Sequence, residues 1–275
     1  MSTRTIDTGT ENFLATIENG VAILTLNRPE SRNAMTVDMW ASLENTLAEV
    51  ELDSDVRCVV LKGSGKGFCA GGDVKSMAES GTDVIGEKTI DSAIHRQRVS
   101  QRGITGRLFK MPKPTLASVQ GPAVGAGLSL ALACDLRVMA DTGIMMTAFA
   151  RVGLSGDYGG TYFMTQLVGS AKARELFFLS ERISAEEALR LGLANWVVPE
   201  NELESKTMEI ANRLASGPSV AYRYMKENLN RAIGGYIDEC LDLEATHHIH
   251  TGLTQDHHDA AVAFVEKREP VFKGY

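Results

Sequence analysis

The sequence has no apolar stretch of about eighteen residues, the length that a membrane-spanning helix needs. Its first segment, MSTRTIDTGTENF, lacks the apolar centre of a secretory signal peptide. Cysteine is scarce, and its four residues have neither metal-ligand nor disulfide-framework spacing (Cys58, Cys69, Cys134 and Cys240). The formal net charge of −7 argues against a dedicated nucleic-acid surface. We therefore expect a cytoplasmic protein that binds neither membranes nor nucleic acid.

What the sequence does contain indicates a layered α/β fold. Two β-prone runs, Phe13–Glu18 and Val21–Leu26, flank Asn19-Gly20, the dipeptide that best fits a type I′ hairpin turn. Beyond this hairpin, short strand-like runs alternate with segments of helical periodicity, a pattern typical of an α/β domain with largely parallel strands. We expect strands at 57–62, 115–119, 136–139 and 195–198, and helices near 36–50, 74–79, 90–109, 126–133 and 185–191.

The C-terminal part has a different character. Nearly every segment from Asn201 onward is helical in pattern, and no long linker, internal repeat or low-complexity tract separates it from the rest. With 44% hydrophobic residues in a chain of 275, the protein can bury one large core. We therefore predict an α/β core over residues 1–200 and a helical region over residues 201–275.

Two glycine-rich loops each stand between a predicted strand and a predicted helix. The first, GSGKGFCAGGD (63–73), does not match the phosphate loop G-x-x-x-x-G-K-[ST], and its composition alone is typical of a tight strand-to-helix turn. The second, GPAVGAGLSLALACD (121–135), has small residues that also serve helix packing. Together, two such loops can present a pair of backbone N–H groups to one oxygen atom. This is how an oxyanion hole is built for an acyl group that becomes an enolate or a tetrahedral anion.

Five segments carry a resemblance to a known family. In chain order they are NRPESRNAM, GKGFCAGGD, KPTLASVQGPAVGAGLSLALACD, GLSGDYGG and AFVEKREPVFKG. This order is similar to that of the crotonase superfamily, the enoyl-CoA hydratase/isomerase family of acyl-CoA enzymes, over nearly the whole chain from Phe13 to Gly274. The resemblance implies a spiral of repeated β-β-α units with a helical C-terminal trimerisation region, and hence a homotrimer or hexamer. It also implies an acyl-CoA thioester substrate and no cofactor, since coenzyme A is part of the substrate.

The same resemblance assigns binding residues. The thioester oxygen would be held by the backbone amides of Cys69 and Ala126. Three parts of the chain would contact coenzyme A, namely Arg32, the run Ala70, Gly71, Gly72 and Asp73, and the pair Phe264 and Lys267. In many members the last pair comes from a neighbouring subunit. Without the resemblance, Phe264 would be interpreted as a core residue and Lys267 as a solvated charge.

The two glutamates of the family's hydratases are replaced in this chain. Their positions hold Ser129 and Phe149, and neither side chain can work unaided as acid or base near neutral pH. Asp157, in GLSGDYGG, resembles instead the catalytic aspartate of phenylacetate-pathway-type enoyl-CoA isomerases. Chlorobenzoyl-CoA dehalogenases also place a nucleophilic aspartate here, but they pair it with a histidine. Our alignment puts Arg102 at that place, with His95 seven residues away.

Simpler roles exist for some of these residues. An aspartate beside glycine commonly caps a turn, which is the structural alternative for Asp157. The histidine cluster HHIHTGLTQDHH (247–258) has no Cys or Glu to complete a metal site, so we interpret it as a solvated helix end and expect no metal. Cys69 has no sequence neighbour that would lower the pKa of its thiol, so we expect its backbone, not its side chain, to contribute.

These observations predict an acyl-CoA enzyme, most simply an enoyl-CoA isomerase that converts a 3-enoyl-CoA to a 2-enoyl-CoA. The thioester enolate would lie in the oxyanion hole while Asp157 carries a proton between carbons. Three alternatives stay open: an enoyl-CoA hydratase of the fatty-acid β-oxidation type, an acyl-CoA dehalogenase or hydrolase, and a catalytically silent acyl-CoA-binding protein. The two replaced glutamates favour the silent protein, and Asp157 argues against it.

Overall fold

The structure, a computed structural model, describes residues 3–73 and 89–275. Its main feature is a seven-stranded sheet in the order β1-β2-β3-β4-β5-β7-β10. The first three strands are antiparallel, and those from β3 to β10 run parallel to one another. They are β1 (Arg4–Ile6), β2 (Phe13–Glu18), β3 (Val21–Leu26), β4 (Cys58–Gly63), β5 (Thr115–Val119), β7 (Leu136–Ala140) and β10 (Trp196–Val198).

The predicted N-terminal hairpin is confirmed. Strands β2 and β3 have the predicted bounds, and their register pairs Phe13 with Leu26 at one end and Glu18 with Val21 at the other. Both turn residues have positive φ, 52° at Asn19 and 80° at Gly20, as a type I′ turn requires. The turn thereby fixes the register and decides which β2 side chains face the core.

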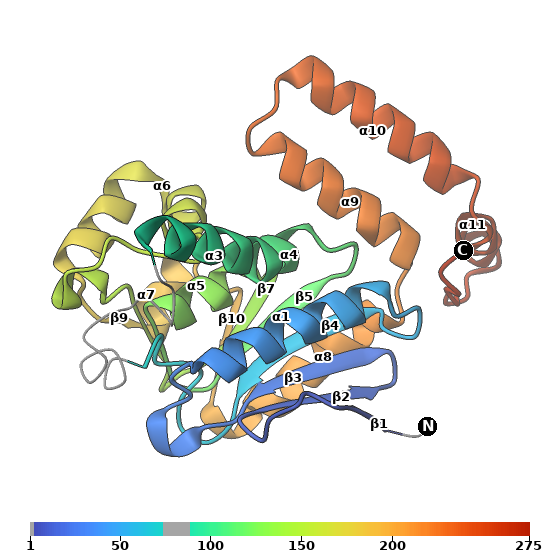
Figure 1. Ribbon diagram of the computed structural model, residues 1–275. Coiled ribbons are helices and arrows are strands. Elements are labelled where there is room, and N and C mark those ends of the chain that lie inside the picture. Colours follow the sequence, from blue (N-terminus) through green and yellow to red (C-terminus); the bar gives the residue numbers. More distant parts are fainter. Residues whose placement is uncertain (1–2, 74–88) are drawn as a thin grey trace.

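Helices cover both faces of the large sheet (Figure 1). Helix α8 (Leu203–Ala215) packs on one face, and α1 (Val37–Leu52), α4 (Thr105–Lys110) and α5 (Ala126–Ala133) contribute to the larger core on the other. Because successive side chains of a strand face opposite sides, Val60 of β4 lies beneath α8 whereas its neighbours lie in the larger core. Both faces of the central strands are therefore buried, as is usual for a parallel sheet.

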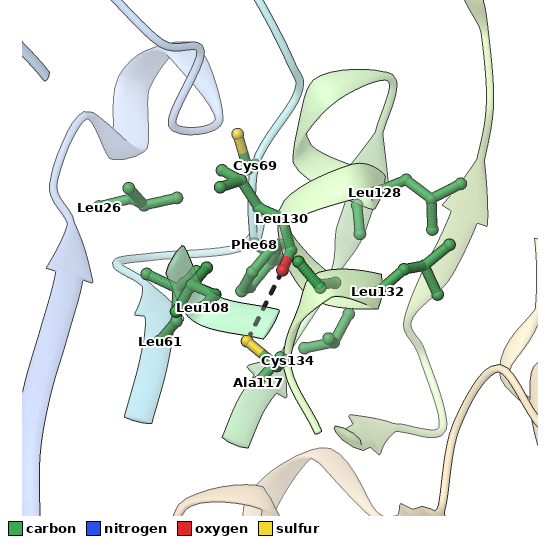
Figure 2. Packing of buried hydrophobic residues seen from close by; sticks show 14 of the residues in the cluster. Leu26, Leu61, Phe68, Cys69, Leu108, Ala117, Leu128, Leu130, Leu132 and Cys134 are labelled. Carbon is green, nitrogen blue, oxygen red and sulfur yellow. Dashed lines mark hydrogen bonds between the residues drawn. The ribbon is translucent and has the colours of Figure 1, made fainter. Parts of the chain in front are cut away.

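The larger core also anchors the first glycine-rich loop. Figure 2 shows Leu61 of β4, Leu108 of α4 and Leu130 of α5 around this loop's Phe68 and Cys69. Phe68 and Cys69 have no exposed surface. The loop is thus fixed by its own buried side chains, and the backbone that follows it has a defined position.

A second, smaller sheet and the remaining helices complete the described chain. The small sheet has the order β6-β8-β9, with β6 (Pro122–Val124), β8 (Ile144–Met146) and β9 (Ile183–Ser184). The other helices are α3 (Ile90–Gly103), α6 (Gly160–Leu179), α7 (Ala185–Arg190), α9 (Ser219–Ala232), α10 (Ile237–Gly252) and α11 (Gln255–Glu266), and the 3₁₀ turns are η1 (Pro29–Ser31), η2 (Phe149–Val152) and η3 (Glu200–Glu202). At the start of α7 the Ser184 hydroxyl accepts the Glu187 N–H at 3.2 Å and caps the helix.

One predicted helix is corrected by the structure, and another lies beyond what it describes. The segment 90–109 was expected to be one helix, but it forms α3 and α4, with a break at Ile104 (φ −107°, ψ −87°). The side chain of Glu44 in α1 packs so closely on Gly103 that a Cβ there would lie 2.3 Å from its carboxylate oxygen. Local periodicity does not report this contact between helices. The helix predicted at 74–79 falls outside the described residues.

The C-terminal helices divide into two groups. Helix α8 lies on the sheet, whereas α9, α10 and α11 project away from it (Figure 1). The boundary predicted after residue 200 therefore precedes a helix that packs within the core layers. No helix in the described part of the chain is long and apolar enough to cross a bilayer.

Candidate active site

The two glycine-rich loops meet at the N-terminus of α5. Cys69 forms a parallel bridge with Ala123 of β6, in which the Cys69 N–H donates to the Pro122 carbonyl at 3.0 Å and the Cys69 carbonyl accepts the Val124 N–H at 2.9 Å. A Cβ on Gly127 would lie 2.2 Å from the Cys69 carbonyl oxygen, so only glycine permits this approach. The bridge brings residues 70–72 beside the first turn of α5.

Most backbone donors of the first loop are used inside the fold. The Phe68 N–H, like that of Cys69, donates to the Pro122 carbonyl, at 3.1 Å. The Ala70 N–H donates to the Arg32 carbonyl at 2.9 Å. The Gly71 N–H lies close enough to the Cys69 sulfur to lower the pKa of its thiol.

These bonds overturn one predicted donor and identify another. The expectation that the Cys69 amide contacts a thioester oxygen is wrong, because its N–H is already bonded to Pro122. Three residues later, the Gly72 N–H has no acceptor among the residues that the structure describes. Gly72 therefore has an available N–H in this loop, whereas the sequence analysis assigned this residue to coenzyme A. The only sequence signal for it was the glycine-rich composition that it shares with its neighbours.

Ala126 is the other residue whose amide the sequence analysis assigns to the thioester oxygen. It is the first residue of α5, and its N–H likewise has no acceptor within residues 3–73 and 89–275. Gly71 lies against it, since a Cβ on Gly71 would be 3.4 Å from the Ala126 nitrogen. The backbone of the Gly71-Gly72 pair thus runs alongside the start of a helix, whose positive end adds to the attraction for an oxyanion.

The Cys69 side chain does not take part in this donor pair. Burial raises the pKa of its thiol to about 12, the Gly71 N–H opposes that rise, and the charge of Asp157 adds to it. At neutral pH the thiol therefore stays protonated and is a poor nucleophile. The effect of Asp157 also indicates that its carboxylate lies near this loop.

Asp157 lies between η2 and α6, against the first turn of α5. Its carbonyl oxygen accepts the Ser129 hydroxyl at 3.0 Å and the Gly160 N–H at 3.0 Å. Ser129 is three residues beyond Ala126 in the same helix, so this contact brings Asp157 to the turn that begins with the Ala126 amide. The Oδ1 atom of its carboxylate is buried. The structure thus gathers Asp157, Gly72 and Ala126 around the start of α5.

The two positions that hold glutamate in hydratases have structural roles here. The Ser129 side chain is buried and bonded to the Asp157 backbone. Phe149 is also buried, and its ring stacks on Phe177 with 5.9 Å between centroids and 8° between planes. A Cβ on Gly125 would lie 3.8 Å from the Phe149 ring, which places this ring next to the residue before Ala126. Asp157 is therefore the acid–base candidate of this group.

Helix α3 reaches the Asp157 loop with an amide side chain. Gln101 Oε1 accepts the Tyr158 N–H at 2.5 Å. The residues weighed as partners of a dehalogenase aspartate, Arg102 and His95, are both exposed on the same helix.

The remaining residues predicted to bind coenzyme A fall into two places. Arg32 is exposed and has a φ of +50°, and its carbonyl accepts the Ala70 N–H. Asp73 forms an ion pair with Arg28 at 3.1 Å. Arg32 and Asp73 therefore lie next to the first glycine-rich loop or at its end. Phe264 and Lys267 lie at the end of α11, where Phe264 is 85% exposed, far across the molecule from α5 and α6 (Figure 1). One protomer does not bring these two to its own site.

The histidine cluster is only partly solvated. Four of its members are exposed, as expected, but His247 is buried between α10 and α9. Its ring lies 4.3 Å from that of Tyr224, and its Nδ1 is 2.6 Å from Asn228 Oδ1. No group of three or more His, Cys, Asp or Glu side chains able to hold a metal occurs among the described residues.

Comparison with known proteins gives a consistent result. The family model described as "Enoyl-CoA hydratase/isomerase" matches residues 16–275. The chain is 36% identical to the 1,2-epoxyphenylacetyl-CoA isomerase of Escherichia coli, covering 96% of this chain and 99% of that protein. It is 35% identical to the short-chain-enoyl-CoA hydratase of Clostridium acetobutylicum, covering 94% and 96%. The crystal structure of an enoyl-CoA hydratase from Bacillus anthracis has a TM-score of 0.87 at 31% identity, covering 96% of this chain and 100% of that one.

Proposed function

The chain belongs to the enoyl-CoA hydratase/isomerase family, with the crotonase fold, and within this family we propose that it is an enoyl-CoA isomerase. The reaction is the shift of a double bond from a 3-enoyl-CoA to a 2-enoyl-CoA, or a related isomerisation of an acyl-CoA. The observation that carries the proposal is the position of Asp157, a half-buried aspartate whose backbone carbonyl is bonded to the helix turn that presents the Ala126 amide.

In the proposed reaction the thioester oxygen accepts the N–H groups of Gly72 and Ala126. Asp157 takes a proton from C2, the electron pair of that C–H bond moves toward the thioester, and the negative charge develops on the oxygen between the two amides. The enolate then reforms the thioester carbonyl while C4 receives the proton from Asp157. One carboxylate suffices, because the proton that leaves C2 balances the proton that C4 gains.

Hydration is the second candidate, favoured by the name of the Clostridium acetobutylicum relative. It requires a water molecule to be both activated and split between two carbons, which normally takes a second acid–base group. Ser129 is bonded to the Asp157 backbone and Phe149 has no proton to transfer, so neither position provides that group. The isomerase named in the Escherichia coli relative fits a single carboxylate better.

We also propose how coenzyme A and the assembly fit this site. Arg32 and the run from Ala70 to Asp73 would contact the coenzyme A of the substrate from the same chain. Phe264 and Lys267 would reach the coenzyme A of a neighbouring copy, since they lie far from the site of their own chain. This arrangement requires an oligomer, which we propose to be a homotrimer or a hexamer of two trimers, and the protein would work in the cytoplasm without a further cofactor.

The test compares two reactions of the purified wild-type protein. We expect turnover of 3-hexenoyl-CoA to 2-hexenoyl-CoA to exceed hydration of 2-hexenoyl-CoA. Faster hydration would support the second candidate. Retention on a coenzyme A column with neither reaction would indicate a silent acyl-CoA-binding protein, and release of free coenzyme A would indicate a hydrolase.

A further inference from the structure

The peptide group between Asp157 and Tyr158 is held from both sides by side chains of two different helices. Its carbonyl oxygen accepts the Ser129 hydroxyl of α5 at 3.0 Å, and its N–H donates to Gln101 Oε1 of α3 at 2.5 Å. Because one rigid plane carries both groups, these bonds restrain ψ of Asp157 and φ of Tyr158 together. They therefore restrain the direction in which the Asp157 side chain leaves the backbone.

Tyr158 is immobilised as well. Its ring stacks on Trp40 of α1, with centroids 4.1 Å apart and planes 5° apart, and its hydroxyl lies 3.1 Å from Ser100 Oγ of α3. Its φ is +46°, a conformation that costs a bulky residue energy and persists only where the surroundings impose it. The residue after Asp157 is thus fixed in a strained backbone conformation by contacts with two helices.

Ser129 stands out within its own helix. It is the only polar side chain of α5, whose sequence is AGLSLALA, and it is 1% exposed. A buried hydroxyl costs free energy unless it is bonded, and alanine has the higher helix propensity. A Cβ on Gly160 would lie 2.5 Å from Ser129 Oγ, so the Asp157 loop closes tightly over this hydroxyl. The shorter bond of this hydroxyl is to the Asp157 carbonyl at 3.0 Å, and the Gly125 carbonyl, at 3.4 Å, is its longer alternative acceptor.

We propose that Ser129 and Gln101 are positioning residues that hold the Asp157 carboxylate in the orientation needed for proton transfer. The inference rests on the proposed function of Asp157. Each residue acts on the backbone of Asp157 and not on the substrate. Removing either bond leaves the carboxylate, the amides of Gly72 and Ala126 and the coenzyme A contacts in place, but lets the Asp157 side chain leave its catalytic orientation.

The first experiment measures kcat and KM of Ser129→Ala and Gln101→Met with 3-hexenoyl-CoA. Misplacement of a reacting group by about 1 Å can cost on the order of a hundredfold in rate, so we expect kcat to fall about ten- to a hundredfold in each variant. KM should change little, because no substrate contact is removed. The control is Ser118→Ala, which deletes the equally buried bond of Ser118 Oγ to Thr207 Oγ1 (2.9 Å) beneath α8 and should leave kcat unchanged.

A double-mutant cycle separates positioning from a general loss of structure. In an Asp157→Asn background, Ser129→Ala should no longer lower the residual kcat, because the group that it orients has been removed. Ser118→Ala should have the same small effect in both backgrounds. If Ser129→Ala lowers the residual rate of Asp157→Asn as much as it lowers the wild-type rate, the positioning role is wrong.

Two outcomes distinguish this inference from the function on which it rests. If Asp157→Asn abolishes turnover but neither Ser129→Ala nor Gln101→Met lowers kcat, the positioning proposal fails and the proposed function stands. If Asp157→Asn itself keeps the wild-type kcat, the proposed function fails, and the positioning proposal fails with it.

Discussion

The thiol of Cys69 is fully buried, and burial raises its pKa to about 12. It donates to the Asn33 carbonyl at 3.2 Å, a contact within the core. We predict that Cys69→Ala keeps most of the turnover of the wild type and lowers the free energy of unfolding by about 1 kcal/mol, the usual effect of losing one such bond. Kinetics with 3-hexenoyl-CoA and thermal melting check this. Strong loss of turnover in a variant that melts normally would contradict it.

Gly71 lies beside the two amides of the proposed oxyanion hole. Its φ is +90°, and a Cβ would lie 2.9 Å from the Val124 carbonyl and 3.4 Å from the Ala126 nitrogen. We predict that Gly71→Ala displaces the Gly72 and Ala126 amides and lowers kcat by about a hundredfold or more, the cost of losing one oxyanion donor.

The control for this change is Gly9→Ala. Gly9 also has positive φ, +70°, but a Cβ there would meet nothing within 4 Å. Both variants carry the backbone strain of an alanine in this region, about 1–2 kcal/mol, but only Gly71→Ala should lose activity. Equal turnover in the two variants would show that the Gly71 contact with Ala126 has no part in the reaction.

Of the two amides in the proposed oxyanion hole, the sequence predicts one and not the other. The Ala126 amide could be predicted, because the first N–H groups of a helix have no partner within the helix. The Gly72 amide could not, since which N–H of residues 68–72 is unbonded depends on the bridge between Cys69 and Ala123 and on the Arg32 carbonyl. Both partners are remote in sequence from Gly72.

Among the structural elements, α9 is tied to the core by a buried ammonium group. Lys226 is 7% exposed, and its Nζ donates to the carbonyls of Leu108 and Lys113 and to the Asp135 carboxylate, at 2.9, 3.1 and 2.8 Å. We predict that Lys226→Met lowers the free energy of unfolding by about 1–3 kcal/mol, because the carboxylate and carbonyls lose a charged partner.

The matched control is Lys206→Met on α8, where the lysine pairs with Glu209 near the surface at 3.0 Å. Such a pair contributes less than about 1 kcal/mol. Urea unfolding of both variants gives the comparison. A Lys226→Met protein as stable as Lys206→Met would mean that the buried ammonium group does not hold α9 in place.

The elements themselves were predictable where local signals decide them. The β2–β3 hairpin follows from Asn19-Gly20, and α5 follows from an apolar run between a glycine-rich loop and Asp135. The division of 90–109 into α3 and α4 was not predicted, and Gly103 at this break lies against Glu44 of another helix, a contact that the periodicity of the segment does not report. The hydrophobic periodicity of one segment carries no information about its contacts with another segment.

On the scale of the whole molecule, the projecting helices leave apolar side chains uncovered. On α9 and α10, Leu229 is 68% exposed, Ile237 70% and Leu241 53%. Exposed apolar side chains on two neighbouring helices usually meet another chain. We predict that isolated protomers are a minority at micromolar concentration, which sedimentation velocity measures. A stable monomer would contradict the proposed trimer or hexamer.

The family resemblance predicted this overall architecture, because its five motifs are spread along nearly the whole chain. The direction in which α9, α10 and α11 leave the core was not predictable from the sequence. It depends on contacts such as that of Lys226 with two carbonyls remote in the chain. For the same reason the sequence could not tell whether Phe264 and Lys267 serve their own site.

The central claim is that Asp157 carries the proton between two carbons of the substrate, and Asp157→Asn tests it most directly. The change keeps the size of the side chain and its ability to cap a turn but removes the base. Asp141→Asn is the control, because Asp141 Oδ1 accepts the Glu200 N–H at 3.2 Å in an exposed loop, as a structural aspartate does.

The measurement is kcat for conversion of 3-hexenoyl-CoA by Asp157→Asn, together with the Kd for hexanoyl-CoA and the Tm. We predict that kcat falls by about two to four orders of magnitude, the usual contribution of a positioned acid–base group. Kd and Tm should stay near those of the wild type, and Asp141→Asn should keep its turnover. Near-full activity of Asp157→Asn, or a fall in Tm with unchanged turnover of the folded protein, would contradict the account.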